Sequence, residues 1–277
     1  MIEFVDKRRS TFDLKAPAWT SSNALAMGIA SQVAYSMPAT LLKTVSAWAG
    51  VAPAFIGRGD TQLFAAYCGE FILVAFRGTE PTQLSDWRTD TSAALVDDPL
   101  APGKVHEGFR DALGFVWQDL SEVLAGVQEK AERDLGTRLP VCLTGHSLGG
   151  ALAELCAARF AAGRLQDVRC VYTYGKPMVG NDDYARTVEA AIGRRAFRVV
   201  NNNDIVPWNP PEALGYHHVG RLCYLTSSGR LRFDPPLSEL VVDGLAGALK
   251  DLGTAGPDGV KDHYLEAYLT VLAALCV

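Results

Sequence analysis

Residues 140–155, P-V-C-L-T-G-H-S-L-G-G-A-L-A-E-L, join a short apolar stretch to an alanine-rich stretch through a glycine-rich turn. The first stretch predicts a buried strand at 140–144, and the second predicts a helix. Between them, Gly145, Ser147 and Gly149 match G-x-S-x-G, the pattern of a serine on a tight turn from strand to helix. Glycines on both sides remove side chains that would block such a turn. Ser147 is therefore the candidate nucleophile, and the alternative is a chance match in a glycine-rich turn.

The chain around this turn alternates between patterns typical of strands and of helices. Such alternation predicts an α/β fold with a mostly parallel central sheet and helices on both of its faces. We expect residues 1–277 to form one domain of this kind, with 1–60 as its N-terminal helical part. Further helices are expected at about 23–48, 108–130 and 182–192, a β-hairpin at 62–68 and 71–76, and buried strands at 168–174 and 197–201.

Composition excludes several classes of function. The net charge of -5 and the lack of clustered basic residues argue against a nucleic-acid ligand. No apolar stretch reaches the roughly 20 residues of a membrane span, and the N-terminus lacks the apolar run of about 7 to 15 residues of a signal peptide. We therefore expect no transmembrane segment, and either a cytoplasmic protein or one exported by a route that needs no signal peptide. The six cysteines never show C-x-x-C spacing, which favours buried free thiols.

A serine hydroxyl becomes a good nucleophile when an imidazole takes its proton and a carboxylate orients that imidazole. Asp204 is the candidate acid, because it follows a predicted strand and precedes a proline-rich loop. The alternative is a surface carboxylate in an asparagine-rich turn. His217, His218 and His263 all follow Asp204, and the order of residues leaves the choice of the base open.

The start of the helix after Ser147 indicates how negative charge would be stabilised. Free backbone N–H groups and the positive end of the helix dipole favour an oxyanion there, and the N–H of Leu148 is the natural first donor. No metal or organic cofactor is expected for this chemistry. The sequence has no H-E-x-x-H, and G-K-P at 175–177 lacks the other residues of a phosphate-binding loop.

Seven motifs resemble, in order, those of the class 3 lipases, the family of fungal triacylglycerol lipases and related feruloyl esterases and phospholipases. The resemblance spans about 71–268. The motifs are F-R-G-T at 76–79, V-H-E-G-F at 105–109, G-H-S-L-G-G at 145–150, Y-G-K-P-M-V-G-N at 174–181, N-D-I-V-P-W-N-P-P at 203–211, Y-H-H-V-G at 216–220 and D-H-Y at 262–264.

The resemblance implies an α/β-hydrolase fold and assigns further roles. His263 would be the catalytic base, while His218 would be a noncatalytic histidine. The backbone N–H of Thr79 would join that of Leu148 in the oxyanion hole. The implied activity is hydrolysis of carboxylic esters through an acyl-enzyme on Ser147, most simply by a triacylglycerol lipase or esterase.

The resemblance also places a lid over about 80–94. Leu84 and Trp87 are its large apolar side chains and are candidates for substrate or lid contacts. The rest of this segment is mostly polar, so we expect only modest activation at a lipid interface. The expected partner is a lipid or other hydrophobic ester, with a transient contact with a lipid interface. Alternatives are a phospholipase A1 or feruloyl-type esterase on the same scaffold, a toxin delivered to foreign membranes, and a noncatalytic interaction protein.

Overall fold

The computed structural model describes residues 19–49, 52–78, 94–250 and 258–276. In this part of the chain, eight strands form a central sheet: β1 (Ala54–Arg58), β2 (Thr61–Tyr67), β3 (Ile72–Phe76), β6 (Val141–His146), β7 (Val168–Tyr174), β9 (Ala196–Asn201), β11 (Arg221–Leu225) and β12 (Leu231–Phe233). Their order across the sheet is β1-β2-β3-β6-β7-β9-β11-β12. The five strands from β3 to β11 run parallel, while β1, β2 and β12 pair antiparallel at the edges. The predicted mostly parallel sheet is confirmed.

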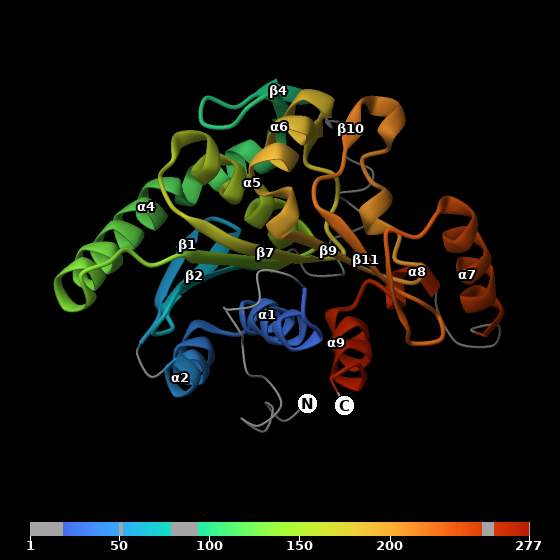
Figure 1. Cartoon of the computed structure of the whole chain (residues 1–277), viewed down its shortest axis with the longest axis horizontal. Coiled ribbons are helices and arrows are strands. Elements are labelled where there is room, and N and C mark those ends of the chain that lie inside the picture. Colours follow the sequence, from blue (N-terminus) through green and yellow to red (C-terminus); the bar gives the residue numbers. More distant parts are fainter. Residues whose placement is uncertain (1–18, 50–51, 79–93, 251–257, 277) are drawn as a thin grey trace.

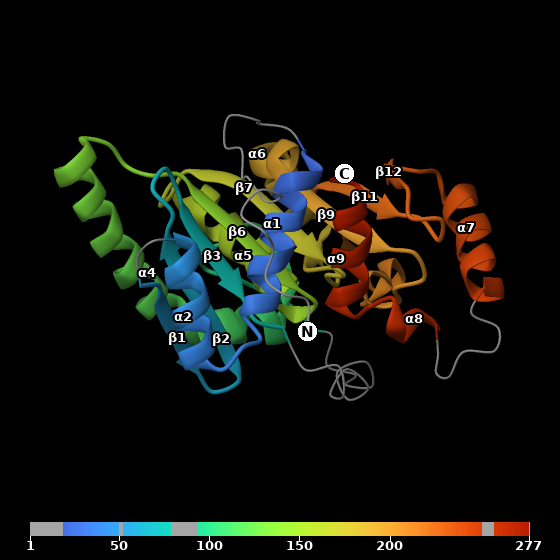
Figure 2. The same cartoon turned by 90° about the horizontal axis from the view of Figure 1, so that it is seen from below.

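Helices cover both faces of this sheet (Figure 1). One face carries α4, α5 and α6, the other carries α1, α2 and α9, and each face has its own buried apolar cluster. Figure 2 shows α1 and α9 side by side across the sheet, with α7 at the outer side beyond β12. The helices are α1 (Ser21–Val33), α2 (Pro38–Ala49), α4 (Glu107–Leu135), α5 (Leu148–Gly163), α6 (Asp182–Ile192), α7 (Leu237–Lys250), α8 (Asp258–Lys261) and α9 (Leu265–Ala274).

Shorter elements complete the described structure. A second sheet of short strands has the order β10-β8-β5-β4. No helix in the described ranges is both long and apolar enough to span a membrane. The strands of the second sheet are β4 (Leu95–Asp97), β5 (Lys104–His106), β8 (Gly180–Asn181) and β10 (Tyr216–His217), and 3-10 turns lie at Gly193–Arg195, Val206–Trp208 and Glu212–Leu214.

Most elements lie close to their expected ranges, but the N-terminal part differs from the expected helical structure. The expected helix over about 23–48 is two helices, because Pro38 lacks the N–H that a continuous helix would need. Within 1–60 the chain also forms β1, which pairs with β2, so this part is not wholly helical. The sequence of β1, A-F-I-G-R, is short and contains Gly57, which weakens its strand signal.

The parallel strands place their following loops at one edge of the sheet. All six residues of β6 are buried, as expected for a central strand covered on both faces. The carboxyl ends of parallel strands are where α/β folds place their ligand sites. The residues that directly follow β6 and β7 and the loop after β9 carry Ser147, Gly175 and Asp204.

Candidate active site

Ser147 occupies the turn between β6 and α5 in a strained conformation, with φ 57° and ψ -129°. The turn is possible because its glycines lack side chains. A Cβ on Gly145 would collide with the backbone of Gly149, and one on Gly149 would collide with the carbonyl oxygen of Phe76. The N–H of Ser147 donates to the carbonyl of Tyr174 at 2.9 Å, which ties the turn to β7. The sequence thus folds into the tight strand-to-helix turn that the motif predicts.

The hydroxyl of Ser147 is not used to stabilise α5. A serine at a helix N-cap ordinarily accepts a hydrogen bond from the helix, yet Ser147 makes no side-chain capping bond in the described structure. The N–H groups of Gly150 and Ala151 donate to the carbonyl of Ser147 at 2.9 and 3.3 Å, whereas the N–H of Leu148 lies at the start of the helix, where α-helical bonding supplies no partner. The N–H of Leu148 therefore suits a developing oxyanion beside Ser147.

Asp204 and His263 form a buried pair, with 0% and 1% of their surfaces exposed. Nδ1 of His263 lies 2.8 Å from Oδ2 and 3.0 Å from Oδ1 of Asp204. The carboxylate also accepts the N–H of Val206 at 2.9 Å and the hydroxyl of Tyr268. Nε2 of His263 is buried and has no hydrogen-bond partner among the described residues. One ring nitrogen is therefore fixed by the acid, and the other remains available to take a proton.

Gly175 and Tyr268 shape the space around this pair. Gly175 has φ 55°, and a Cβ there would lie 2.9 Å from Nδ1 of His263 and against the Asp204 carboxylate. Burial, followed by repulsion from Asp204, raises the pKa of Tyr268 well above its ordinary value of 10. The tyrosine therefore stays protonated and donates to the acid. Substitution of either residue would disturb the pair.

His146 supports the backbone of His263. Its Nε2 lies 2.7 Å from the carbonyl oxygen of His263, and its Nδ1 lies 2.9 Å from the hydroxyl of Tyr35. Burial, followed by repulsion from His263, holds the pKa of His146 well below its ordinary value of 6.5. The ring is therefore neutral and carries one N–H. Because a carbonyl can only accept, that proton lies on Nε2, and Nδ1 accepts from Tyr35.

Asp262 joins the loop that carries the acid to the segment that carries the histidine. Its Oδ2 accepts the backbone N–H of Asn203 at 3.0 Å and the side-chain amide of Asn202 at 3.1 Å. Its backbone carbonyl accepts the side-chain amide of Asn201 at 3.1 Å. Three consecutive residues before Asp204 are thus bound to the residue before the histidine.

A cleft of about 550 Å³ reaches the serine turn from the side of α4. Gly78 and Leu148, both next to Ser147, line it, and so does the exposed ring of Phe115. Its walls also carry both polar and charged groups, so the cleft offers more than apolar contacts to a ligand. The remaining lining residues are Arg58, Gly59, Asp60, Thr61, Gln62, Arg77, Gly108, Asp111 and Ala112.

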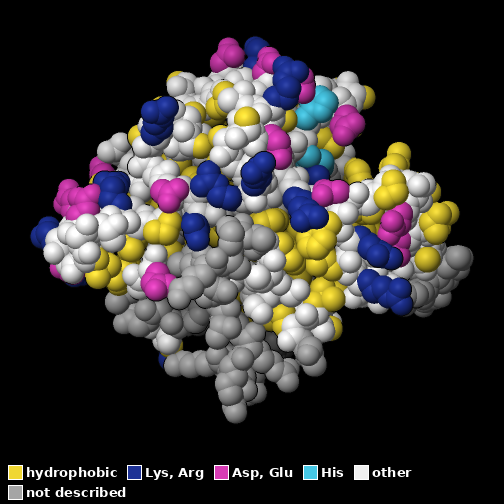
Figure 3. Space-filling model, viewed as in Figure 1, with side chains coloured by type: hydrophobic (Ala, Val, Ile, Leu, Met, Phe, Trp, Pro, Cys, Tyr) yellow, Lys and Arg dark blue, Asp and Glu magenta, His cyan; other side chains and the backbone are white. Residues whose placement is uncertain are grey.

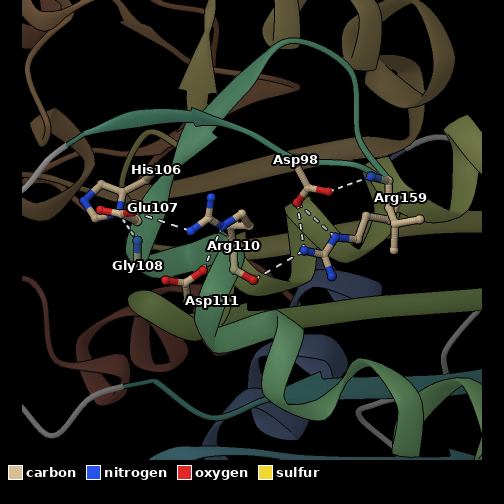
Figure 4. A network of polar contacts seen from close by, with 8 residues as sticks. Asp98, His106, Glu107, Gly108, Arg110, Asp111 and Arg159 are labelled. Carbon is tan, nitrogen blue, oxygen red and sulfur yellow. Dashed lines mark hydrogen bonds and ion pairs between the residues drawn. The ribbon is translucent and has the colours of Figure 1, made fainter.

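A network of ion pairs and hydrogen bonds fixes the N-terminus of α4 beside this cleft (Figure 4). The guanidinium of Arg159, on α5, lies 2.7 Å from Oδ2 of Asp98, and both side chains are almost fully buried. Arg159 also donates to the carbonyl of Arg110 at 3.3 Å, and Arg110 in turn bonds Asp111 at 2.7 Å. At the start of the helix, Nδ1 of His106 accepts the N–H of Gly108. The cleft wall is therefore bound to α5, the helix that follows Ser147.

The other residues expected in the site lie apart or outside the described residues. His218 makes no described contact with Asp204, and its buried Nδ1 has no hydrogen-bond partner in the described ranges. Burial, followed by repulsion from Arg198, holds the pKa of His218 well below 6.5, so the ring is neutral. His217 lies in β10. Three further expected residues, Thr79, Leu84 and Trp87, fall outside the described residues.

Four residues support the site although the sequence predicted no such role for them. Asp262 stands in the D-H-Y motif and His146 in the G-H-S-L-G-G motif, so each could have been found as the neighbour of a candidate catalytic residue. Tyr35 and Tyr268 carry no comparable signal, because a tyrosine in an apolar helical stretch resembles any core residue.

The mostly parallel sheet, the turn at Ser147 and the order of serine, aspartate and histidine along the chain define an α/β-hydrolase. Residues 73–214 match the family model of the class 3 lipases, and the chain belongs to this family.

Sequence similarity to two lipases supports the place of the chain in this family. A lipase of Rhizomucor miehei is 33% identical over 194 residues, which cover 68% of this chain and 49% of that protein. The secreted mono- and diacylglycerol lipase 1 of Fusarium solani is 35% identical over 191 residues, which cover 68% of this chain and 54% of that protein. The chain thus spans about half the length of these two relatives.

Solved structures show the same fold. The triacylglyceride lipase of Rhizomucor miehei superposes with a TM-score of 0.64 at 25% identity, covering 94% of this chain and 99% of that one. A triacylglycerol lipase whose catalytic centre is formed by a serine protease triad superposes with a TM-score of 0.65 at 27% identity. That comparison covers 89% of this chain and 94% of the other.

Proposed function

We propose that the protein is a serine carboxylic ester hydrolase that acts on lipid esters, acylglycerols above all, through an acyl-enzyme on Ser147. The observation that carries this proposal is the pairing of His263 with Asp204 through Nδ1 while Nε2 has no partner in the described structure. A histidine held in this way can accept a proton only through its second nitrogen. The strained serine turn lies at the same edge of the sheet.

In the proposed reaction, Oγ of Ser147 attacks the carbonyl carbon of the ester and its proton passes to Nε2 of His263. Asp204 holds Nδ1–H and stabilises the imidazolium that forms. The oxyanion is stabilised by the N–H of Leu148 and, as the family resemblance implies, by Thr79. Collapse of this intermediate expels the alcohol, which takes the proton from Nε2.

The second half of the proposed reaction returns the enzyme to its starting state. Water attacks the acyl carbonyl while His263 takes one of its protons. The carboxylic acid then leaves, and Oγ of Ser147 recovers a proton from Nε2. No group outside the protein, the ester and water is required for atoms and protons to balance.

The proposed substrate class rests on the relatives. The Rhizomucor relative is a lipase, and the Fusarium relative is a secreted mono- and diacylglycerol lipase. An acylglycerol presents an uncharged ester next to a long apolar chain, and such substrates gather at a lipid interface. We therefore also propose a transient contact between the protein and that interface.

Ser147→Ala tests the nucleophile. We expect the variant to fold normally and to lose several orders of magnitude in turnover of p-nitrophenyl butyrate, as happens when the nucleophile of other triads is removed. A fluorophosphonate probe should label the wild-type protein at Ser147. Label on another serine, or near-normal turnover by the variant, would refute the mechanism.

Two histidine variants provide the matched comparison for the base. His263→Ala should lose about as much turnover as Ser147→Ala, because members of a triad act as a unit. His218→Ala removes a partly buried histidine that makes no described contact with Asp204, so it should keep its turnover even if it loses stability. The reverse result would assign the base to His218. Rates on p-nitrophenyl esters of rising chain length, triglyceride and phospholipid would then define the substrate.

A further inference from the structure

An apolar stripe runs along the exposed side of α7. Leu237, Val241 and Leu245 follow one another at intervals of four residues and are 69%, 54% and 62% exposed. Val242, beside them, is 67% exposed. Residues four apart lie on the same face of a helix, so the stripe is continuous. Figure 3 shows apolar side chains over the lobe that α7 forms.

A groove of about 580 Å³ separates this helix from the loop that carries the catalytic acid. Ile205 and the half-exposed ring of Trp208 form one wall, and Leu237, Val241 and Leu245 form part of the other. Because this loop follows β9, the wall it forms lies at the edge of the sheet that also carries the serine turn. The groove has the size of sites that hold one apolar ligand or chain segment.

The acidic side chains near this stripe have partners elsewhere. Asp243 accepts the hydroxyl of Tyr224 at 3.0 Å and the N–H of Ser227 at 2.8 Å. Glu239 forms an ion pair with Arg232 at 3.1 Å. Among the described residues, no charged side chain lines the groove. It therefore offers nothing to neutralise a phosphate or carboxylate and suits uncharged acyl chains.

The helix is also bound to the acid's loop. The side-chain amide of Asn203, the residue before Asp204, donates to the carbonyl of Gly244 in α7 at 2.9 Å. A lipid surface that contacts α7 would therefore be held in a fixed relation to the active site.

We propose that the apolar stripe of α7 and the groove beside Trp208 form the surface by which the protein docks on an uncharged acylglycerol phase. This inference rests on the proposed function. It places the docking surface on α7, a different part of the chain from the segment 80–94 that the family resemblance assigns to a lid. An amphipathic helix with an uncharged apolar side binds an interface in proportion to the apolar area that it buries there.

The test measures binding separately from hydrolysis. Proteins carrying Ser147→Ala are mixed with triolein droplets and recovered by flotation, so that no substrate is consumed. Val241→Asp/Leu245→Asp should reduce recovery with the droplets at least about tenfold, because two large apolar contacts are replaced by charges. Val241→Ser/Leu245→Ser, which adds no charge to the helix, should show a smaller reduction in the same direction.

The matched control is Leu135→Asp/Leu165→Asp. These leucines are 52% and 46% exposed and lie just before β6 and β7 in the chain, at the opposite edge of the sheet. The control should bind droplets as the parent does. With Ser147 intact, Leu135→Asp/Leu165→Asp should hydrolyse dissolved p-nitrophenyl butyrate at the parental rate.

Each outcome is decisive. Undiminished flotation of both α7 variants, or equal loss in the control, overturns the docking surface. A parent that is a dimer in solution, and that the α7 variants convert to monomers, would assign the stripe to a second copy and also overturn it. If the parent protein hydrolyses no ester, the proposed function fails, whereas the flotation result still decides whether α7 binds lipid.

Discussion

Asp262→Ala would remove two of the three hydrogen bonds between Asp262 and the residues that precede Asp204. Oδ2 of Asp262 accepts bonds from Asn202 and Asn203 at 3.1 and 3.0 Å, and both are lost in the variant. A hydrogen bond to a charged group contributes about 1.5–3 kcal/mol, and partial exposure of Asp262 favours the lower end. We therefore expect the free energy of unfolding to fall by about 3 kcal/mol for the two bonds.

The same substitution should also slow the reaction of the folded protein. Asp204 directly follows the bound asparagines, and His263 directly follows Asp262. Loss of the two hydrogen bonds therefore loosens Asp204 relative to His263. Misplacement of a catalytic group by about 1 Å can cost on the order of 100-fold in rate, so we expect kcat to fall about 10- to 100-fold with little change in KM. Asp262→Asn keeps an acceptor but loses the charge, and should fall between the parent and Asp262→Ala.

The measurements are urea unfolding and steady-state rates on a dissolved ester, at a temperature where each variant is folded. Asp243→Ala is the control, because Asp243 also accepts a backbone N–H and a side-chain donor through Oδ2. Because Oδ1 of Asp243 also accepts the hydroxyl of Ser227 at 2.9 Å, this variant should lose at least as much stability as Asp262→Ala and keep its kcat on the dissolved ester. If Asp262→Ala loses stability but turns over at the parental rate, the two hydrogen bonds of Asp262 are only structural and the reasoning fails.

Two further predictions concern buried ionisable groups. Lys176 and Glu154 form an ion pair at 2.8 Å with each side chain 2% exposed, so Lys176→Met should lose about 3–5 kcal/mol in urea unfolding by leaving a carboxylate unpaired. Lys176→Met/Glu154→Gln should recover most of that loss, and equal stability of the single and double variants would contradict the argument. His146 has its pKa held well below 6.5, so below about pH 6.5 the unfolded chain binds a proton that the folded one excludes. The free energy of unfolding should therefore fall with falling pH by up to about 1.4 kcal/mol per unit, and His146→Gln should reduce this slope, whereas an unchanged slope would refute the assignment.

The sequence predicts the central fold well because its signals are local. The strand, turn and helix around Ser147 follow from apolar and glycine positions within a few residues, and β6 and α5 form where expected. The hairpin of β2 and β3 likewise follows from two apolar runs, with Tyr67 opposite Ile72. By contrast, β1 is short and only partly buried, and its strand state depends on pairing with β2.

The base illustrates what local patterns cannot decide. His217, His218 and His263 all follow Asp204, and their order along the chain does not say which one reaches the carboxylate. The family resemblance implies His263, and the structure places its Nδ1 2.8 Å from Asp204. This contact joins residues 59 positions apart, so it depends on how α9 packs against the sheet.

The pairing of buried polar side chains could not be predicted from the sequence for a related reason. Glu154 lies in a run of alanine and leucine, where a charge at one position predicts an exposed helix face. In the structure α5 is buried around most of its surface, and Glu154 is neutralised by Lys176 from the loop after β7. Burial of a charge becomes acceptable only when its partner arrives, and that partner is distant in the sequence.

Three neighbouring residues fix the position of His263, while Nε2 of its ring has no hydrogen-bond partner among the described residues. Asp204 fixes its Nδ1, His146 binds its backbone carbonyl, and Asp262 binds the loop before the acid. Because His146 is neutral and donates through Nε2, it holds the backbone without adding a second positive charge when His263 takes a proton. A protonated His146 would oppose that step by repulsion. Burial of His146 therefore serves the proposed proton transfer as well as the packing, and Nε2 of His263 remains the one ring nitrogen left to react.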